Sequence, residues 1–150
     1  AIAIIGGAPA RFAPLVELYR AAGADAGHAP ATLRVGINSH GYIADDSQRA
    51  AEEAFPPYVD TMGRIGRERG WSAPTREHFE RERAPGGALL IGSPQQVIDK
   101  LLAEHEVFRN DRFLLQFSVG TMPHDRSLHS IELFGSVVAP AVRAAIGSGG

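Results

Sequence analysis

A repeated alternation of short apolar strands and amphipathic helices is the feature that most constrains the fold of this chain. Residues 1–5 form a continuous apolar run that ends in a double glycine, and a helical pattern follows at once. The same order recurs after residues 33–43 and after residues 112–119. Strands that are each followed by a crossover helix form a parallel sheet with helices packed on it. The sequence therefore predicts an α/β fold of roughly three strand-helix units.

The chain is short for a closed barrel of this kind. An eight-stranded parallel barrel needs roughly 250 residues, whereas this chain has 150 and no methionine at its start. We therefore expect residues 1–146 to be the last part of a larger (β/α)8 TIM barrel, with a flexible tail at 147–150. A natural half-barrel stays open as the alternative.

Composition argues against several classes of function. The 15 Lys and Arg residues are matched by 17 Asp and Glu residues, and no basic stripe points to nucleic acid. The absence of cysteine removes disulfides, thiolate metal sites and cysteine nucleophiles. The longest uninterrupted apolar run is too short to cross a bilayer, and the amino end lacks the basic flank of a signal peptide. We expect a cytoplasmic protein without a nucleic-acid or membrane partner.

Local signals place the helices. Pro9 suits the first turn of a helix, and Ser93 is an N-cap candidate, with Pro94 at the first helical position and Gln96 reaching back to it. The apolar stripe of the first helix is expected to comprise Phe12, Leu15, Val16 and Tyr19. A last helix is expected after residue 124, and its apolar residues include Leu128, Ile131, Phe134 and Val138.

Residues 47–87 are too long for an ordinary connection between a strand and a helix. A helical pattern starts this segment, and Pro56 and Pro57 are expected to kink or break it. Mixed arginine and acidic residues follow. We expect either a lid-like insertion or a pair of solvated helices, in which Arg64 and Arg67 are candidates for contacting an anionic substrate or a cofactor phosphate.

The first two candidate sites follow strands, because ligand-binding groups of parallel α/β folds gather at the carboxyl ends of the strands. Gly6 and Gly7 would let a phosphate or a flat ring approach the backbone, and the alternative is a simple tight turn. His40 shares one strand face with Asn38 and Tyr42. It is a candidate proton donor or hydrogen-bond anchor, or else a structural histidine, since alternation alone does not say which face is inside.

The third candidate site is on the last strand. Gln116 and Ser118 alternate with apolar residues, and polar side chains on a buried strand suggest a polar cavity. His124, in the turn that follows, either lines the same mouth or caps the last helix. His124 and His129 are five residues apart, which does not suit two metal ligands on one helical face, and no serine lies in a nucleophile elbow.

Four segments together resemble a known family. Residues 3–12, 39–45, 90–97 and 120–124 are similar to the carboxy-terminal half of bacterial luciferase-like flavin monooxygenases, and the likeness runs through nearly all 150 residues. The Gly-Ser-Pro helix start and the Gly-Thr-Met-Pro-His turn are its most specific parts. The resemblance implies a (β/α)8 barrel whose mouth binds reduced FMN, or the deazaflavin F420 in some branches, for reaction with oxygen or hydride transfer.

The resemblance also implies roles for individual positions. It places the chain at roughly the sixth to eighth barrel strands, with the insertion 47–87 as a mobile cover. It implies that Gly6 and Gly7 lie near the cofactor, that His40, Gln116 and Ser118 line the pocket wall, and that His124 lies at the rim. Together with the analysis of the residues, we expect Gly6, Gly7, Gln116 and Ser118 to bind the cofactor and His40 to be catalytic. Arg64 and Arg67 stay candidates for the substrate side or the rim. The family's first half, which carries much of the flavin site, has no counterpart in this chain.

We therefore expect an FMN-dependent monooxygenase that acts on a small organic substrate and is inactive as an isolated fragment. A flavin reductase is a candidate electron source, and a homo-oligomer is the expected assembly. A deazaflavin-dependent hydride transferase is the alternative enzyme. A non-catalytic half-barrel that binds a partner or a second copy is the alternative outside enzymes, because an incomplete sheet exposes unpaired edges and an apolar face.

Overall fold

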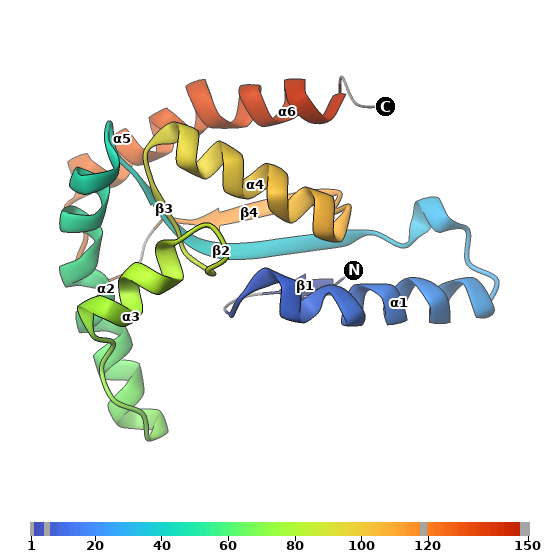
Figure 1. Ribbon diagram of the computed structural model, residues 1–150, viewed down its shortest axis with the longest axis horizontal. Helices are drawn as coiled ribbons and strands as arrows, with labels where there is room; N and C mark the ends of the chain where they lie inside the picture. Colours follow the sequence, from blue (N-terminus) through green and yellow to red (C-terminus); the bar gives the residue numbers. More distant parts are fainter. Residues whose placement is uncertain (1, 5–6, 118–119, 148–150) are drawn as a thin grey trace.

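The computed structural model describes residues 2–4, 7–117 and 120–147, and its elements alternate as the sequence indicates (Figure 1). The strands are β1 (Ile2–Ile4), β2 (Val35–Ile43), β3 (Leu90–Gly92) and β4 (Arg112–Gln116). The α-helices are α1 (Ala13–Asp25), α2 (Ser47–Arg69), α3 (Arg76–Arg83), α4 (Pro94–Phe108), α5 (His124–Leu133) and α6 (Ala139–Gly147). Short 3₁₀ helices at Pro9–Phe12 and Pro30–Thr32 precede α1 and β2, and a π-helical segment at Phe134–Val138 joins α5 to α6.

The strand β2 is the centre of a parallel sheet. Its first part pairs with β1, where Ile4 is opposite Ile37, and its middle pairs with β4, where His40 is opposite Gln116. Its last three residues pair with β3, where Ile43 is opposite Gly92. The strand β3 was not expected from the sequence, because an apolar run this short before a helix start gives no periodic signal.

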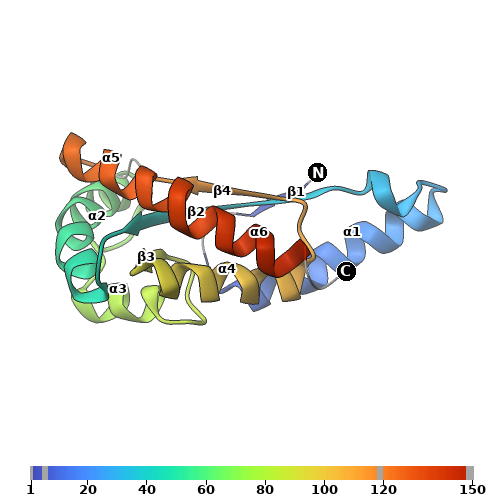
Figure 2. The same cartoon turned by 90° about the horizontal axis from the view of Figure 1, so that it is seen from above.

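Helices α1 and α4 pack on one side of this sheet (Figure 2). Val35 and Ile37 of β2 form a buried cluster with Val16 of α1 and Phe108 of α4. Further along β2, Ile43 joins a second cluster with α4 and with the helical segment that ends the chain. The other side of the sheet is bare along most of its length in Figure 2, with α2 at its left-hand end.

Cap geometry explains where two helices begin. The Ser93 hydroxyl accepts from the Gln96 backbone N–H at 3.4 Å, and the Gln96 side chain accepts from the Ser93 N–H at 3.1 Å, so the expected capping box is confirmed. Asp46 caps α2 by accepting from the Arg49 N–H at 2.8 Å. The helix α2 then runs through Pro56 and Pro57 without ending, so of the two expected outcomes, a kink or a break, the break does not occur. Pro57 is buried in the packed insertion, whose tertiary contacts offset the backbone hydrogen bonds that prolines forfeit.

The expected apolar stripe needs correction on the first helix. Leu15 is 52% exposed, whereas Val16 is buried and Phe12 and Tyr19 pack beside it. Leu128 and Ile131 are also about half exposed, at 52% and 47%. The buried positions of the last helical segment are Ser130, whose hydroxyl accepts from the Ile43 N–H at 2.7 Å, and Val138. The π-helical segment adds a residue to the turn and shifts the buried face, which a regular helical period does not anticipate.

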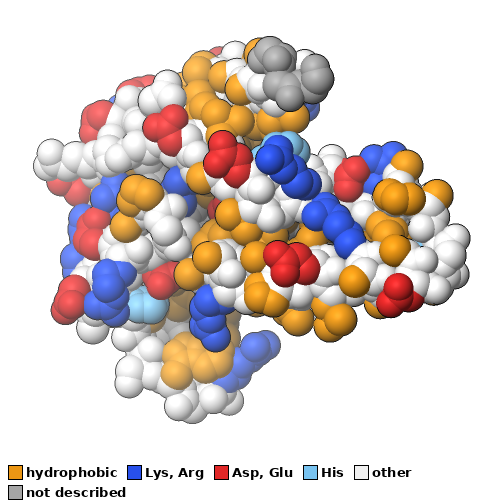
Figure 3. Space-filling view, turned by 45° about the vertical axis from the view of Figure 1, so that its right-hand side comes forward, with side chains coloured by type: hydrophobic (Ala, Val, Ile, Leu, Met, Phe, Trp, Pro, Cys, Tyr) orange, Lys and Arg blue, Asp and Glu red, His pale blue; other side chains and the backbone are white. Residues whose placement is uncertain are grey.

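The helical stretch His124–Gly147 is long and apolar enough to cross a membrane by length and composition, with a mean hydropathy of 1.3. Only 11% of this apolar window is buried by the rest of the described chain. Here the stretch packs on β2 through α5 and on α4 through α6. On the face in Figure 3, acidic and basic side chains lie interspersed among apolar ones.

Candidate functional site

The sheet register brings two of the expected site residues together. His40 of β2 and Gln116 of β4 are aligned on adjacent parallel strands. Asn38 is aligned in the same way with Leu114. Because side chains of neighbouring parallel strands at one register share a face, His40, Asn38 and Gln116 lie on the same side of the sheet. The side chains that alternate with them on β2 pack on the helices, so this side is the open one.

The double-glycine turn borders this region. Gly7 has a φ of +83°, a left-handed conformation that favours glycine. It lines a small hollow together with Asn38 and Ser39 of β2. The turn therefore lies beside the strand that carries His40. Two further candidates, Gly6 and Ser118, lie outside the described residues.

The insertion covers the carboxyl end of the open face. Tyr42, the next residue after His40 on this face, is 3% exposed and packs in one cluster with Ala54 and Tyr58 of α2. A second small hollow of about 10 Å³ lies here between β2, β3, α2 and the segment that follows β4. Its lining comprises His40, Gly41, Tyr42, Ala54, Tyr58, Ile91, Phe117 and Met122. The walls are apolar and aromatic except for the imidazole and the two phenol groups.

Burial sets the protonation of these polar side chains. It lowers the pKa of His40 below its ordinary value near 6.5, so the imidazole is neutral at pH 7. Burial and the hydrogen bond to Glu53 both raise the pKa of the Tyr42 hydroxyl, which therefore keeps its proton. Among the described residues, His40 Nδ1 and Asn38 Oδ1 are buried without a hydrogen-bond partner. Buried polar atoms of this kind normally have a hydrogen-bond partner.

A network of hydrogen bonds and ion pairs lies at the edge of the site. The Tyr42 hydroxyl donates to Glu53 of α2 at 2.5 Å, and Glu53 accepts from Arg49 at 3.0 Å. Arg126 of α5 lies 3.6 Å from the same carboxylate. The network joins the site strand to the insertion and to the last helical segment. Asp45, which ends β2, adds a contact of 2.9 Å with His129 of α5.

The remaining candidates are exposed and line neither of the two small hollows. His124 is exposed at the first turn of α5, beyond the end of β4. Arg64 and Arg67 are exposed on the second half of α2. The structure describes no contact between either arginine and the open face. Their contact with an anionic ligand therefore stays a prediction.

A buried pair on α4 escaped the sequence analysis. Lys100 is 6% exposed and donates to the carbonyl oxygens of Ala84 and Leu89 at 2.8 and 2.7 Å, which anchors the end of the insertion. Glu104 is 4% exposed, and neither carboxyl oxygen has a partner within the described structure. Glu104 lies three residues after the buried Leu101, on the apolar face of the helix. A carboxyl group at such a position is the sequence signal that could have identified Glu104.

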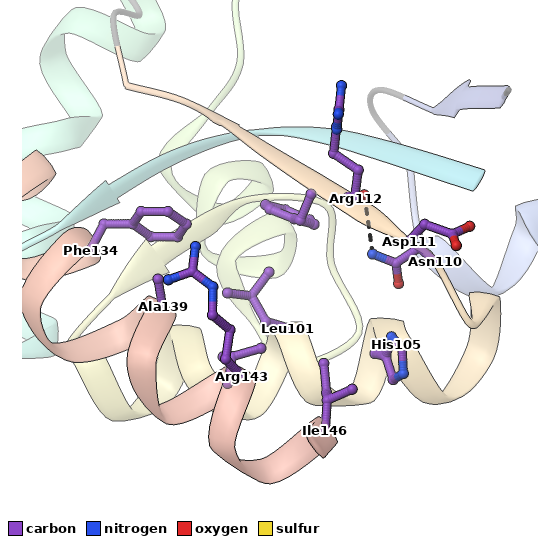
Figure 4. A pocket seen from close by; sticks show the side chains of 11 residues that line it. Leu101, His105, Asn110, Asp111, Arg112, Phe134, Ala139, Arg143 and Ile146 are labelled. Carbon is purple, nitrogen blue, oxygen red and sulfur yellow. Dashed lines mark hydrogen bonds between the residues drawn. The ribbon is translucent and has the colours of Figure 1, made fainter. Parts of the chain in front are cut away.

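A roomier hollow of about 310 Å³ lies at the opposite end of β4, between α4 and α6 (Figure 4). Leu101 and His105 of α4 and Arg143 of α6 line it. Asn110, just before β4, donates from its side-chain amide to the Arg112 carbonyl at 3.2 Å. Because ligands of parallel α/β folds bind at the carboxyl ends of strands, this hollow is not part of the candidate site.

Comparison with known proteins identifies a family. The family model for luciferase-like monooxygenases matches residues 2–110. An uncharacterized protein of Sinorhizobium fredii, y4vJ, is 39% identical over 59 residues, which are 39% of this chain and 17% of that protein.

Several solved structures share the fold. The monooxygenase RslO1 from Streptomyces bottropensis superposes with a TM-score of 0.72 at 22% identity, over 93% of this chain and 41% of that one. The oxygenating constituent of 3,6-diketocamphane monooxygenase from Pseudomonas putida, solved with FMN, gives 0.66 at 19% identity over 93% and 42%. EDTA monooxygenase from Chelativorans sp. BNC1 gives 0.62 at 15% identity over 96% and 42%. The chain thus spans less than half the length of these proteins.

Proposed function

The chain belongs to the luciferase-like monooxygenase family, and from this premise we propose that it forms part of the flavin site of an FMN-dependent monooxygenase that acts on a small organic substrate. The likeness of its fold to that of flavin-dependent monooxygenases supports the proposal. One of these relatives was solved with FMN, which favours FMN over a deazaflavin. When bound, a reduced flavin supplies the electrons and the reactivity toward oxygen.

The observation that carries the proposal is the alignment of His40 with Gln116 on the open face, beside the buried and unpartnered Asn38 Oδ1. The isoalloxazine ring of a flavin has hydrogen-bond donors and acceptors along one edge. Asn38 and Gln116 each offer an amide, and the neutral imidazole of His40 offers one donor and one acceptor. These side chains fit the polar edge of a flat ring.

This chain's own residues would hold and shield the ring. Gly7 is in a left-handed turn, and the Phe12 ring packs against it. Tyr58 and Met122 line the hollow above His40 and would exclude water from the ring. His40 would hold or move a proton at Nδ1 or Nε2 because its neutral form dominates at pH 7.

The insertion 47–87 is proposed to act as the cover of the site. Its helix α2 contacts the site strand through the Tyr42 and Glu53 hydrogen bond, and its aromatic residues pack at the carboxyl end of the open face. We also propose that the chain is part of a (β/α)8 barrel, that a flavin reductase supplies the electrons, that the protein is a homo-oligomer and that it is cytoplasmic.

Flavin titration tests the proposal. We expect FMN to bind, with quenching of its fluorescence, either to the isolated chain or to a longer chain with the full length of the relatives. His40→Ala and Gln116→Ala should each weaken binding about tenfold, as expected for the loss of one good hydrogen bond to a ligand. Leu18→Ala, on the exposed surface of α1, is the matched control.

The same titration with a deazaflavin tests the alternative enzyme. Preferential binding of the deazaflavin would favour hydride transfer over oxygen activation. If the longer chain binds neither flavin, the oxidoreductase function is wrong and the binding-module alternative takes its place.

A further inference from the structure

Two helical faces and the start of β4 enclose the roomier hollow between α4 and α6 (Figure 4). On α4, Leu101 and His105 are four residues apart and therefore share one face. The lining residues of α6 recur at spacings of three and four, which also places them on one face, and they are Ala139, Val142, Arg143 and Ile146. A volume of about 310 Å³ lies at the lower end of the range for small-molecule sites.

The floor of this hollow is apolar. Leu101 is 6% exposed and belongs to the buried cluster that joins α4 to β2. Phe113 of β4, Phe134 of the π-helical segment and Val142 of α6 pack against the same cluster. A ring that enters the hollow would remove its own apolar surface and that of these side chains from water, which favours binding.

Arg143 brings a free positive charge to the hollow. Its guanidinium has no hydrogen bond and no ion pair with any residue that the structure describes. Figure 4 shows the side chain rising from α6 toward Phe134 and β4 rather than away into solvent. A guanidinium presents its N–H donors as a planar fork, which matches the two oxygens of a carboxylate.

The other charged residues of the lining do not compete for this role. The Asp111 carboxylate accepts hydrogen bonds from Arg34 and from the Val35 N–H, so its charge is already compensated. Arg112 alternates with Phe113 on β4, and Figure 4 shows its side chain on the side of the strand that faces away from the hollow. The charge offered to a ligand here is therefore a single positive one.

We propose that this hollow binds a small aromatic carboxylate. The carboxylate would pair with the Arg143 guanidinium, and the ring would lie on the apolar floor between Leu101 and Phe134. One cation matches one carboxylate, and the aromatic floor favours a ring. The site lies at the opposite end of β4 from the proposed flavin site, so it is a second ligand site that does not depend on the proposed function.

The test measures binding of 4-fluorobenzoate to the 150-residue chain, which supplies every lining residue of the hollow. The fluorine NMR signal of this probe shifts and broadens when it binds. The ligand control is 4-fluorobenzamide, which has nearly the same shape and no charge. We expect 4-fluorobenzoate to bind with a Kd of about 1 mM, as is usual for a ligand of this size, and 4-fluorobenzamide to bind about tenfold more weakly.

Variants separate the contribution of charge from that of shape. Arg143→Ala should weaken binding of 4-fluorobenzoate at least about tenfold and leave 4-fluorobenzamide nearly unchanged, because only the anion loses a charge-assisted contact. Arg143→Lys should restore part of the affinity. Ala139→Phe fills the hollow with a ring and should block both ligands. Arg11→Ala and Ala144→Phe change exposed positions outside the lining, and as matched controls they should bind both ligands as the native chain does.

The outcomes decide the proposal without reference to flavin. If the native chain binds 4-fluorobenzoate no more tightly than 4-fluorobenzamide, or binds neither up to about 10 mM, the site is overturned. It is also overturned if Arg143→Ala binds 4-fluorobenzoate as the native chain does. Because Arg143 is exposed, this variant should keep the fold, which helical circular dichroism checks, so the result stands even if Ala139→Phe unfolds the chain.

Discussion

Burial decides the protonation state of two residues that lie one turn apart on α4. Glu104 has a pKa raised to about 7, and burial lowers the pKa of Lys100 to about 8. Both side chains are less than 7% exposed. Burial removes water from each group, so the charged form of each is less favoured than it is in water. This part of the molecule therefore responds to pH near neutrality.

The stability of the chain should fall as pH rises from about 4.5 to about 7. Over this range the folded protein keeps the Glu104 proton that the unfolded chain releases, so the free energy of unfolding decreases with pH. The loss is on the order of 3 kcal/mol. Urea unfolding at pH 5 and pH 7.5 measures it.

Glu104→Gln should remove this slope and be more stable than the native chain above pH 7. Glu106→Gln should retain the slope, because Glu106 is exposed on the same helix. An unchanged slope in Glu104→Gln would show that Glu104 titrates at its ordinary value and is solvated in the folded protein.

At the scale of elements, the turn between α2 and α3 brings the backbone and indole ring of Trp71 close to Gly66 of α2. A Cβ added to Gly66 would lie 2.6 Å from the Trp71 carbonyl oxygen and 2.7 Å from the Trp71 indole Cδ1. Gly70 ends α2 in a left-handed conformation with φ +83°, and its N–H donates to the Gly66 carbonyl at 2.8 Å. Gly66 thus leaves room for the Trp71 turn, and Gly70 ends α2.

Gly66→Ala should displace Trp71 and cost about 1–3 kcal/mol, the usual range for overpacking. Trp71 is the single tryptophan of the chain, so its fluorescence reports the displacement directly. Gly135→Ala is the matched control, because a Cβ there meets nothing within 4 Å in a helical segment. A native emission spectrum and melting temperature in Gly66→Ala would mean that the Trp71 turn does not pack on α2.

For the whole molecule, the distribution of apolar surface is uneven. Helices cover one side of the sheet, and the open side carries Leu114 at 48% exposure on β4 (Figure 2). Leu128 and Ile131 add exposed apolar surface on α5. Exposed apolar surface and free strand edges favour association with other protein surfaces. In relatives more than twice as long, further chain is available to cover such surfaces.

The isolated chain should therefore self-associate at micromolar concentration. Leu114→Lys, which places a charge on the open side, should weaken association at least about tenfold, because burying an unpaired charge is unfavourable. Sedimentation velocity measures this. Leu18→Lys, at 65% exposure on α1, changes charge equally and should leave association unchanged. If the chain stays monomeric at 100 µM, the open side does not mediate self-association.

Local sequence signals were sufficient for the strand-helix alternation, apart from the short strand β3, and for the ends of several elements. The alternation of apolar strands and helices predicts the parallel α/β arrangement, and Ser93 with Gln96 predicts the start of α4. These features depend on residues within a few positions of one another, so the sequence alone determines them. A kink or a break was expected at Pro56 and Pro57, and the helix continues through them, with Pro57 buried.

Only the tertiary structure decided which face of β2 is open and which residues meet there. Alternation places Asn38 and His40 on one face, but the packing of Val35 and Ile37 on α1 and α4 is needed to show which face this is. The alignment of His40 with Gln116 joins residues 76 positions apart, and a one-residue slip would send one of them to the other face. Register and burial are set by contacts between distant segments, so the sequence by itself determined the elements, and the packing determined the site.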